Sequence, residues 1–217
     1  MSKFKRVSRC DLFNLIIVHI CDSCGKMRED CLKTGNHLPN HEDKISNRLV
    51  ENYLDINSFE LVFILQKPEN FNATSDTFVG RTDISVISSD RLKNRNAYLT
   101  IECKRIDGKK ALNKKYVEDG LARFVVPPLK YSSYYGKSIM LGYVVTALGN
   151  VSENTKKIDE IQREMLVGIE IGEMQLMHED GKGFSHHQCT YKVNGLVDIE
   201  LAHLFYDFSN AMEKVDA

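Results

Sequence analysis

The uninterrupted apolar run at residues 138–146 limits the fold more than any other feature. It reads Ser-Ile-Met-Leu-Gly-Tyr-Val-Val-Thr and contains no charged residue. A strand of this kind is covered on both faces, because a strand with one exposed face would alternate apolar and polar positions. The sequence therefore predicts a sheet between two layers. At 217 residues, 42% hydrophobic and 27% charged, the chain is long enough to bury such a core in one domain.

Helical and extended patterns surround this run. Amphipathic or charged segments predict helices at 41–54, 111–126 and 154–169, the second ended by Pro127-Pro128. Short apolar or alternating segments predict strands at 59–65, 82–88 and 97–105, followed late in the chain by 174–177, 188–193 and 197–205. Residues 67–77 are expected to form a polar loop, and residues 15–18 a first core element. This order predicts a mixed α/β sandwich.

Composition excludes several classes of protein. Four prolines and no long low-complexity tract argue against extended disorder. The apolar run 15–18 is too short to span a membrane, and no small-residue cleavage site follows it. We expect a cytoplasmic protein with no membrane partner. Six cysteines without a secretory signal then indicate free thiols or a metal site rather than disulfides.

Charge is distributed unevenly along the chain. Residues 91–137 hold twelve Lys or Arg against four Asp or Glu, a local excess of about +8 that a phosphate backbone could attract. Residues 150–217 hold six basic against thirteen acidic residues, about −7. The basic stretch contains Glu102 and Lys104, two of the three residues of the strongest catalytic pattern.

That pattern is an acid, a second acid and a lysine on neighbouring strands. In the strand at 97–105, Glu102 and Lys104 share one face, while Cys103 points to the other. Asp83 begins the preceding strand, so a hairpin would place it beside Glu102. Two carboxylates and an ammonium would then share one polar patch.

Such a patch suits phosphodiester hydrolysis. Asp83, Glu102 and the backbone carbonyl of Cys103 offer hard oxygen ligands for Mg²⁺ or Mn²⁺. Lys104 could orient or deprotonate a water molecule or stabilise transition-state charge. Glu42 is the preferred accessory acid for a second ion. Glu51 is the alternative, and it lies about 180° around the same helix, so at most one of the two can face the site.

Two short motifs carry a family resemblance. Gly80-Arg81-Thr82-Asp83 followed by Ile101-Glu102-Cys103-Lys104 resembles the PD-(D/E)XK nuclease superfamily, which includes many restriction endonucleases. The preceding acid-bearing helix, the following basic helix and the strand at 138–146 match the family's order over residues 40–146. Thr82 stands where the family often has proline.

The resemblance implies a fold and an activity. It implies a restriction-endonuclease-like α/β core, with a mixed central sheet flanked by helices and a C-terminal strand-rich extension. We expect one domain over residues 1–217, with its core at about 40–146 and with segments 1–39 and 147–217 packed on it. The implied activity is a Mg²⁺-dependent endonuclease acting on DNA, in restriction or antiviral defence, as a homodimer or with partner proteins. Asp83, Glu102 and Lys104 would be catalytic, with Glu42 as accessory. The alternative is a non-cleaving nucleic-acid-binding or scaffolding subunit of a larger complex.

The basic helix offers contacts for phosphates. Five cations are candidates: Lys109, Lys110, Lys114, Lys115 and Arg123. The competing interpretation is a helix that buries Tyr116 and Phe124 in the core and leaves solvated lysines around them.

Cysteines near the N-terminus suggest a second hypothesis. Cys21 and Cys24 have zinc-knuckle spacing, and Cys31 with His37 or His41 could complete a Zn²⁺ site in a zinc-stabilised interaction protein. Cys189 could instead complete an iron–sulfur set. Reduced, unligated thiols are the other interpretation.

Late histidines have a structural interpretation. Residues 186–189, His-His-Gln-Cys, are expected to lead into a strand, and His203 is expected to be a hydrogen-bonded core or edge histidine. The sequence shows no Ser-His-Asp signature and no nucleotide-binding glycine loop.

Overall fold

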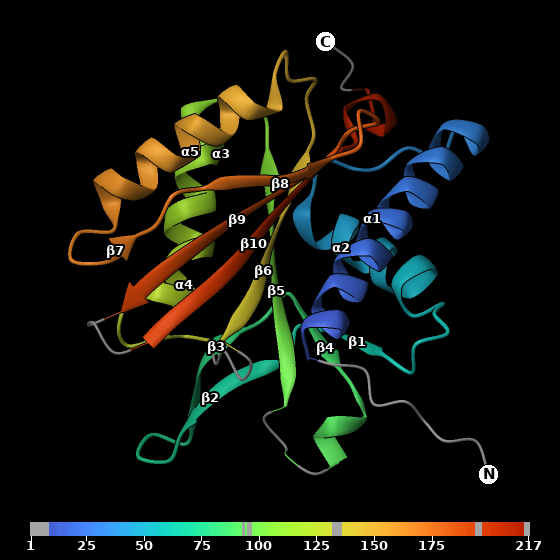
Figure 1. Ribbon diagram of the computed structural model, residues 1–217. Coiled ribbons are helices and arrows are strands. Elements are labelled where there is room, and N and C mark those ends of the chain that lie inside the picture. Colours follow the sequence, from blue (N-terminus) through green and yellow to red (C-terminus); the bar gives the residue numbers. More distant parts are fainter. Residues whose placement is uncertain (1–8, 93, 95–96, 132–135, 194–196, 215–217) are drawn as a thin grey trace.

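A mixed eight-stranded sheet forms the centre of the molecule (Figure 1). The computed structural model describes residues 9–92, 94, 97–131, 136–193 and 197–214. Along the sheet the strands are β1 (Val62–Leu65), β4 (Ile84–Ile87), β5 (Tyr98–Ile106), β6 (Lys137–Val144), β10 (Val197–Asp207), β9 (Phe184–Val193) and β7 (Glu170–Ile171), with β8 (Gln175–Glu179) also paired to β9. The β5–β6 and β6–β10 pairs are parallel and the others antiparallel.

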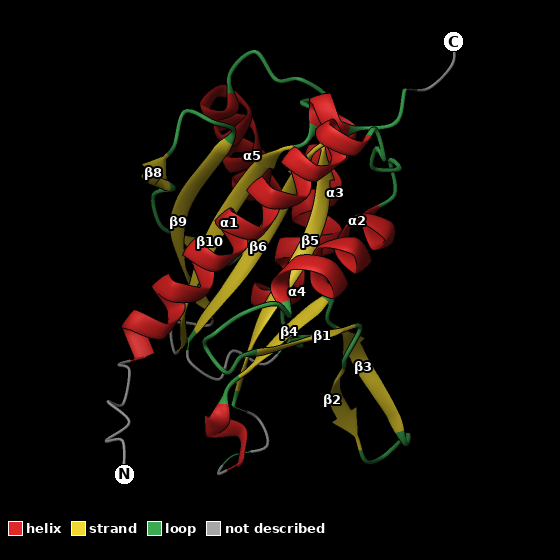
Figure 2. Cartoon of the chain, turned by 90° about the vertical axis from the view of Figure 1, so that its right-hand side faces the viewer, coloured by secondary structure: helices red, strands yellow, loops and turns green. Residues whose placement is uncertain are grey.

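Helices cover both faces of this sheet (Figures 1 and 2). On one face lie α1 (Arg9–Thr34), α2 (Glu42–Leu49) and its π-helical continuation η1 (Val50–Leu54). On the other lie α3 (Lys110–Lys115), the π-helix η3 (Tyr116–Leu121), α4 (Ala122–Val125) and α5 (Val151–Met165). The prediction of a mixed α/β fold with a mixed central sheet flanked by helices is confirmed. None of the helices in these ranges has the length and apolar character that crossing a membrane requires.

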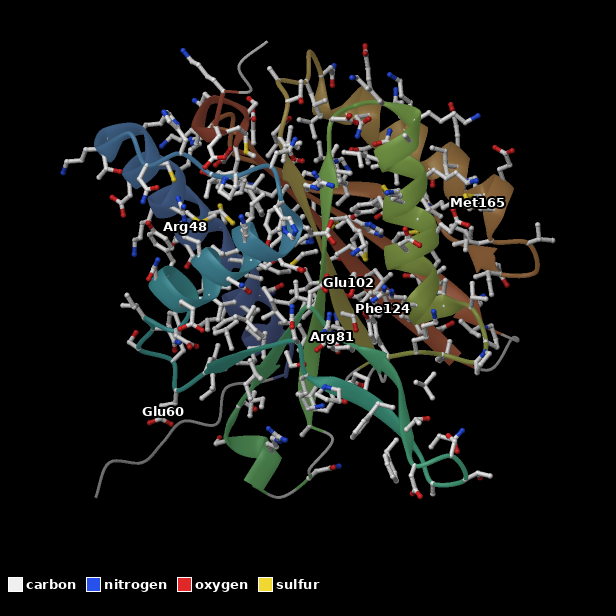
Figure 3. The ribbon with its side chains drawn as sticks, turned by 180° about the vertical axis from the view of Figure 1, so that it is seen from behind. Arg48, Glu60, Arg81, Glu102, Phe124 and Met165 are labelled. Carbon is white, nitrogen blue, oxygen red and sulfur yellow. The ribbon has the colours of Figure 1, made fainter. Side chains whose placement is uncertain are left out.

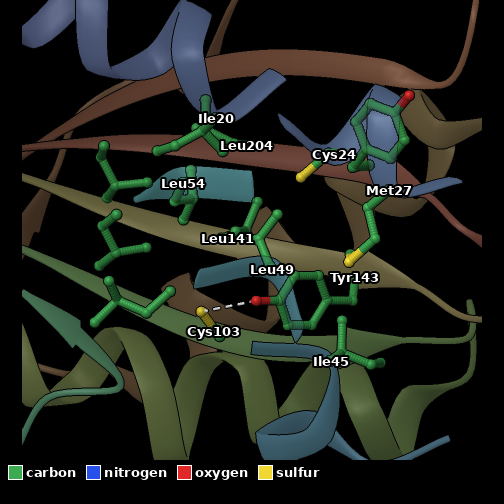
Figure 4. Close-up of a cluster of buried hydrophobic side chains, with 14 of the residues drawn as sticks. Ile20, Cys24, Met27, Ile45, Leu49, Leu54, Cys103, Leu141, Tyr143 and Leu204 are labelled. Atoms are coloured by element: carbon green, nitrogen blue, oxygen red, sulfur yellow. Dashed lines mark hydrogen bonds between the residues drawn. The ribbon is translucent and has the colours of Figure 1, made fainter. Parts of the chain in front are cut away.

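Strand β6 separates two hydrophobic cores. Leu141 and Tyr143 pack with α1, α2 and η1, and Met140 and Val144 pack with the helices of the opposite face. The prediction that this strand is covered on both faces is therefore confirmed. In the first core, shown in Figure 4, the Tyr143 hydroxyl donates to Sγ of Cys103 at 3.3 Å. This contact links β6 to the strand that carries the candidate site.

The hairpin predicted from the strands at 82–88 and 97–105 is present. Strands β4 and β5 pair antiparallel, with Ile84 opposite Ile101 and Ile87 opposite Tyr98. The helix predicted at 111–126 is also present, although η3 interrupts its α-helical geometry. The helix ends at Val125, and Pro127 and Pro128, which cannot continue a helix, come directly after Val126.

The prediction of a polar loop at residues 67–77 is wrong. This segment supplies β2 (Pro68–Asn72), which pairs with β3 (Thr77–Arg81) in a separate two-stranded sheet. Its polar residues gather at the turn, where the Asn72 side chain accepts the N–H of Thr74 at 2.9 Å. Phe71 and Phe78 face each other across the strands, and such a cross-strand aromatic pair stabilises a hairpin that polarity alone would not predict.

The C-terminal strands extend the central sheet. β10 pairs in parallel with β6, with Leu204 opposite Leu141, and β9 pairs antiparallel with β10. β6 needs hydrogen-bonding partners along both of its edges because it is buried, and β10 supplies the second set. The segment 147–217, expected as an extension packed on the core, thus supplies β7, β8, β9 and β10, four of the eight strands of the central sheet.

Candidate functional site

Strand alternation on β5 directs the predicted site residues as expected. Glu102 is fully buried and Lys104 is nearly so. The Cys103 side chain points to the other face of β5, into the core that packs against α1 and α2. Asp83 lies between β3 and β4, and its Oδ2 accepts the backbone N–H of Cys103 at 2.7 Å. The hairpin therefore places Asp83 beside the middle of β5.

The ammonium group of Lys104 is surrounded by oxygen atoms. Its Nζ lies 2.8 Å from Oε1 of Glu102, 3.0 Å from Oε1 of Glu42 and 3.7 Å from Oδ2 of Asp83. It also donates to the carbonyl oxygen of Cys103 at 2.7 Å. The residues predicted as metal ligands and catalytic groups thus meet around one atom.

Glu42 is the accessory acid that reaches this cluster. It is the first residue of α2, and its Oε2 accepts the backbone N–H of Arg105 at 3.1 Å. The Arg105 guanidinium in turn donates to the carbonyl and side-chain oxygens of Asn40, both at 2.8 Å. These contacts attach the start of α2 to β5, whereas Glu51, on η1, is exposed.

Two residues beyond the sheet fix the Glu102 carboxylate. The Tyr131 hydroxyl lies 2.6 Å from Oε2 of Glu102 and 2.8 Å from the carbonyl oxygen of Arg81, so either oxygen can accept its proton. Arg123 donates to that hydroxyl at 2.6 Å and pairs with Oε1 of Glu102 at 3.3 Å. Figure 3 shows Glu102 on β5 close to Arg81, the last residue of β3, at the base of the β2–β3 hairpin. Nothing in the sequence pattern singles out Tyr131, because it follows the prolines in an irregular segment.

The buried charges shift each other's protonation. Burial, followed by the negative charge of Asp83, raises the pKa of Glu102, and Lys104 and Arg123 only partly offset this, so the pKa is about 7. Burial alone would lower the pKa of Lys104, but Glu102, Asp83 and Glu42 outweigh it and raise that pKa. The lysine therefore stays charged, while Glu102 exchanges its proton near neutral pH.

A glycine in η3 makes room for the buried lysine. A Cβ at Gly120 would lie 3.2 Å from Cγ of Lys104 and 2.7 Å from Cε of Met140. The helix can approach β5 this closely because Gly120 has no side chain. A π-helical segment at this point is consistent with a functional site, where such segments are frequent.

The cluster opens onto a two-part cleft. One cavity, of about 590 Å³, lies against the β2–β3 hairpin and is lined in part by Phe78, Arg81, Asp83 and Lys130. The other, of about 350 Å³, lies against the basic helix and is lined in part by Lys115 and Asp119. The two share four lining residues, Glu42, Asp43, Lys104 and Arg123, so the cluster lies where they join.

The predicted phosphate-binding cations divide into two groups. Lys115 and Arg123 line the cleft. Lys109 and Lys110 are exposed at the start of α3, and Lys114 is exposed and lies 3.8 Å from Glu118 one turn on. The competing interpretation also holds in part, because Tyr116 and Phe124 are buried in the core. Arg81 and Lys130, which lie outside the predicted basic helix, line the cleft on the side of the β2–β3 hairpin.

The cluster matches a divalent cation in ligand chemistry. Three carboxylates and a backbone carbonyl present the hard oxygen atoms that Mg²⁺ selects. In the described ranges, no three His, Cys, Asp or Glu side chains are arranged to hold a metal ion. The oxygens are instead gathered on the ammonium of Lys104, which takes the central position.

The predicted zinc set of Cys21, Cys24, Cys31 and His37 is not assembled. The three cysteines lie on α1, where the seven residues from Cys24 to Cys31 separate their backbones by about 10 Å, too far for a shared tetrahedral ion. Cys24 and Cys31 are buried in the first core, and burial raises the pKa of the Cys24 thiol well above its usual value. Cys189 lies in the second core, so it cannot complete a set with them.

Comparisons with other proteins give no further guide to the site. No family model, curated protein or solved structure matches the chain.

Proposed function

We propose that this protein is a metal-dependent phosphodiesterase of the PD-(D/E)XK type, an endonuclease acting on nucleic acid. The observation that carries the proposal is the convergence of Glu42, Asp83, Glu102 and the Cys103 carbonyl on the ammonium of Lys104 at the junction of an open cleft. A cluster of buried charges is costly to maintain, which favours a functional reason for it.

Each residue has a role in this proposal. Asp83 and Glu102, with the Cys103 carbonyl, would hold Mg²⁺ or Mn²⁺, and Glu42 would be the accessory acid. Such an ion, when bound, offsets charge on the phosphate and lowers the pKa of a bound water. Lys104 orients the attacking water and stabilises negative charge on the phosphate. Tyr131 and Arg123 hold Glu102 in place, and Lys115, Arg81 and Lys130 attract the phosphate backbone.

A cleavage panel tests the proposal. Purified protein is incubated with Mg²⁺ or Mn²⁺ and with duplex, single-stranded and branched DNA and RNA. We expect metal-dependent cleavage of at least one substrate, and a loss of at least a hundredfold in Asp83→Asn, Glu102→Gln and Lys104→Met. Chelation should abolish cleavage in the wild type.

Glu42 and Glu51 provide a matched pair. Both are glutamates of the same helical segment, but Glu42 contacts Lys104 and Glu51 is exposed. We expect Glu42→Gln to lower the cleavage rate and Glu51→Gln to leave it unchanged. Intact substrates throughout the panel, or equal activity of wild type and Lys104→Met, would refute the nuclease.

A non-cleaving nucleic-acid-binding module is the second candidate. The position of the Lys104 ammonium favours it, because its positive charge already offsets the repulsion among the three surrounding carboxylates without an ion. This candidate predicts salt-sensitive binding of nucleic acid that needs no metal and survives Asp83→Asn. It also predicts no cleavage in any arm of the panel.

A further inference from the structure

The β2–β3 hairpin carries exposed aromatic side chains next to the candidate site. Phe71 and Phe78 are each 54% exposed, and their ring centroids lie 5.3 Å apart in an edge-to-face arrangement. Val79, beside them, is 43% exposed. In Figures 1 and 2 the hairpin projects from the end of the central sheet, away from both helical layers.

The base of this hairpin is fixed to the site. Thr82 donates its backbone N–H to the carbonyl of Lys67 at 3.0 Å, and a Cβ at Gly80 would lie only 2.8 Å from the carbonyl oxygen of Lys130. Tyr131 joins the carbonyl of Arg81 to Glu102. These contacts attach the base of the β2–β3 hairpin to the part of the site that contains Glu102.

Cations line the cavity that one of the rings shares with the acids. Arg81, Arg123 and Lys130 line the same cavity as Phe78 and Asp83. Across the junction, Lys115 lines the adjoining cavity. A surface that combines a tract of cations with exposed aromatic rings has the chemistry of a site for a polyanion with flat apolar groups.

We propose that the hairpin binds unpaired bases of a single-stranded polynucleotide, which stack on Phe78 and Phe71 while the adjoining phosphates lie along Arg81, Lys130 and Arg123. This inference rests on the proposed function, because it names the substrate class of the same site. Bases within a duplex are stacked on each other, so their faces are closed to these rings. An unpaired base offers its face, so it can stack on an aromatic side chain.

Binding is measured without cleavage, by fluorescence anisotropy in EDTA. The probes are one short labelled sequence as single-stranded DNA, as single-stranded RNA and as duplex DNA. We expect single strands to bind at least tenfold more tightly than the duplex, and the DNA and RNA arms identify the preferred sugar. Phe71→Ala/Phe78→Ala should weaken single-strand binding by roughly tenfold or more.

Two further variants separate stacking from folding. Phe78→Leu keeps an apolar cross-strand contact but removes the aromatic face, so it should weaken single-strand binding far more than it lowers the melting temperature. Leu176→Ala removes an equally exposed apolar side chain on β8 and should leave binding unchanged.

Equal affinity for duplex and single strands, or full affinity in the double alanine variant, would overturn the inference. Absence of nucleic-acid binding by the folded protein would also overturn it. The two proposals fail separately. Ring-dependent binding without metal-dependent cleavage refutes only the nuclease, and duplex cleavage unaffected by the Phe78 variants refutes only the stacking surface.

Discussion

The Nζ atom of Lys104 lies 2.8 Å from Oε1 of Glu102, although the two residues are only two positions apart on the same strand. Side chains at this spacing leave the strand on the same face, so the ion pair follows from the pleat of β5. Both side chains are nearly excluded from water, and Asp83 and Glu42 share the same ammonium. The site thus holds more acid than base within reach of Lys104, and its properties depend on pH.

The stability of the protein should respond to Glu102 between pH 4.5 and 7. The folded-state pKa is raised to about 7, so over this range the unfolded chain releases a proton that the folded protein retains. Rising pH therefore destabilises the fold, by up to about 3 kcal/mol at roughly 1.4 kcal/mol per pKa unit. Urea unfolding of wild type and Glu102→Gln at pH 4 to 8 measures this. The wild type should lose stability relative to the variant, and parallel curves would contradict the assignment.

Tyr131→Phe should destabilise the folded protein. The change removes the hydroxyl that lies between Glu102, Arg123 and the Arg81 carbonyl, and hydrogen bonds to charged groups contribute about 1.5–3 kcal/mol. We expect a similar loss in the free energy of unfolding. Tyr53→Phe is the control, because the Tyr53 hydroxyl contacts Asp30 at an exposed position. A loss as large in Tyr53→Phe would show that the effect is not specific to the site.

Gly120→Ala should destabilise the fold, contrary to the usual effect of this change in a helix. Alanine is normally favoured over glycine there by about 1 kcal/mol. Here the new methyl group would crowd Cγ of Lys104 and the fully buried Met140, so a loss of about 1 kcal/mol is expected. Thermal unfolding measures it. Gly149→Ala, where nothing lies within 4 Å of the added Cβ, should not destabilise the protein, and a gain in stability at Gly120 would refute the packing argument.

His203 should make the fold sensitive to acid. The ring is fully buried, which confirms the expectation of a hydrogen-bonded core histidine. The Tyr191 hydroxyl donates to Gln162, so it accepts from Nε2 of His203, and Nδ1 then accepts the hydroxyl proton of Tyr116. Burial lowers the pKa of His203 to about 3, so the ring stays neutral in the fold while the unfolded chain takes up a proton below about pH 6.5.

Stability should therefore fall as pH decreases from 6.5 toward 3, by up to about 5 kcal/mol from this one group. The check is urea unfolding of wild type and His203→Gln across pH 4 to 7. The variant should be less stable at pH 7 but lose less on acidification. If both lose stability equally, His203 is not the cause, and the neighbouring His187, whose pKa burial lowers to about 4, becomes the better candidate.

Local sequence determined most of the central strands and the direction of the candidate site's side chains on β5. The apolar run at 138–146 required cover on both faces, and the period of two on β5 separated Glu102 and Lys104 from Cys103. The short charged segment after Ile87 was sufficient to predict the β4–β5 hairpin and with it the approach of Asp83 to β5. Each of these features depends on residues close together in the chain.

Only the tertiary structure decided which distant residues complete the site. Glu42 and Tyr131 reach Glu102 and Lys104 from segments whose own patterns are compatible with several arrangements. Cys21 and Cys24 on α1 have the spacing of zinc ligands. The face of α1 that carries them packs against the sheet, so they belong to the hydrophobic core. The polar residues around Phe71 gave the β2 segment the pattern of a loop, so its pairing with Phe78 on β3 could not be predicted. Side-chain burial and long-range pairing depend on how whole layers pack. They therefore depend on residues far apart in the chain and cannot be predicted from one segment alone.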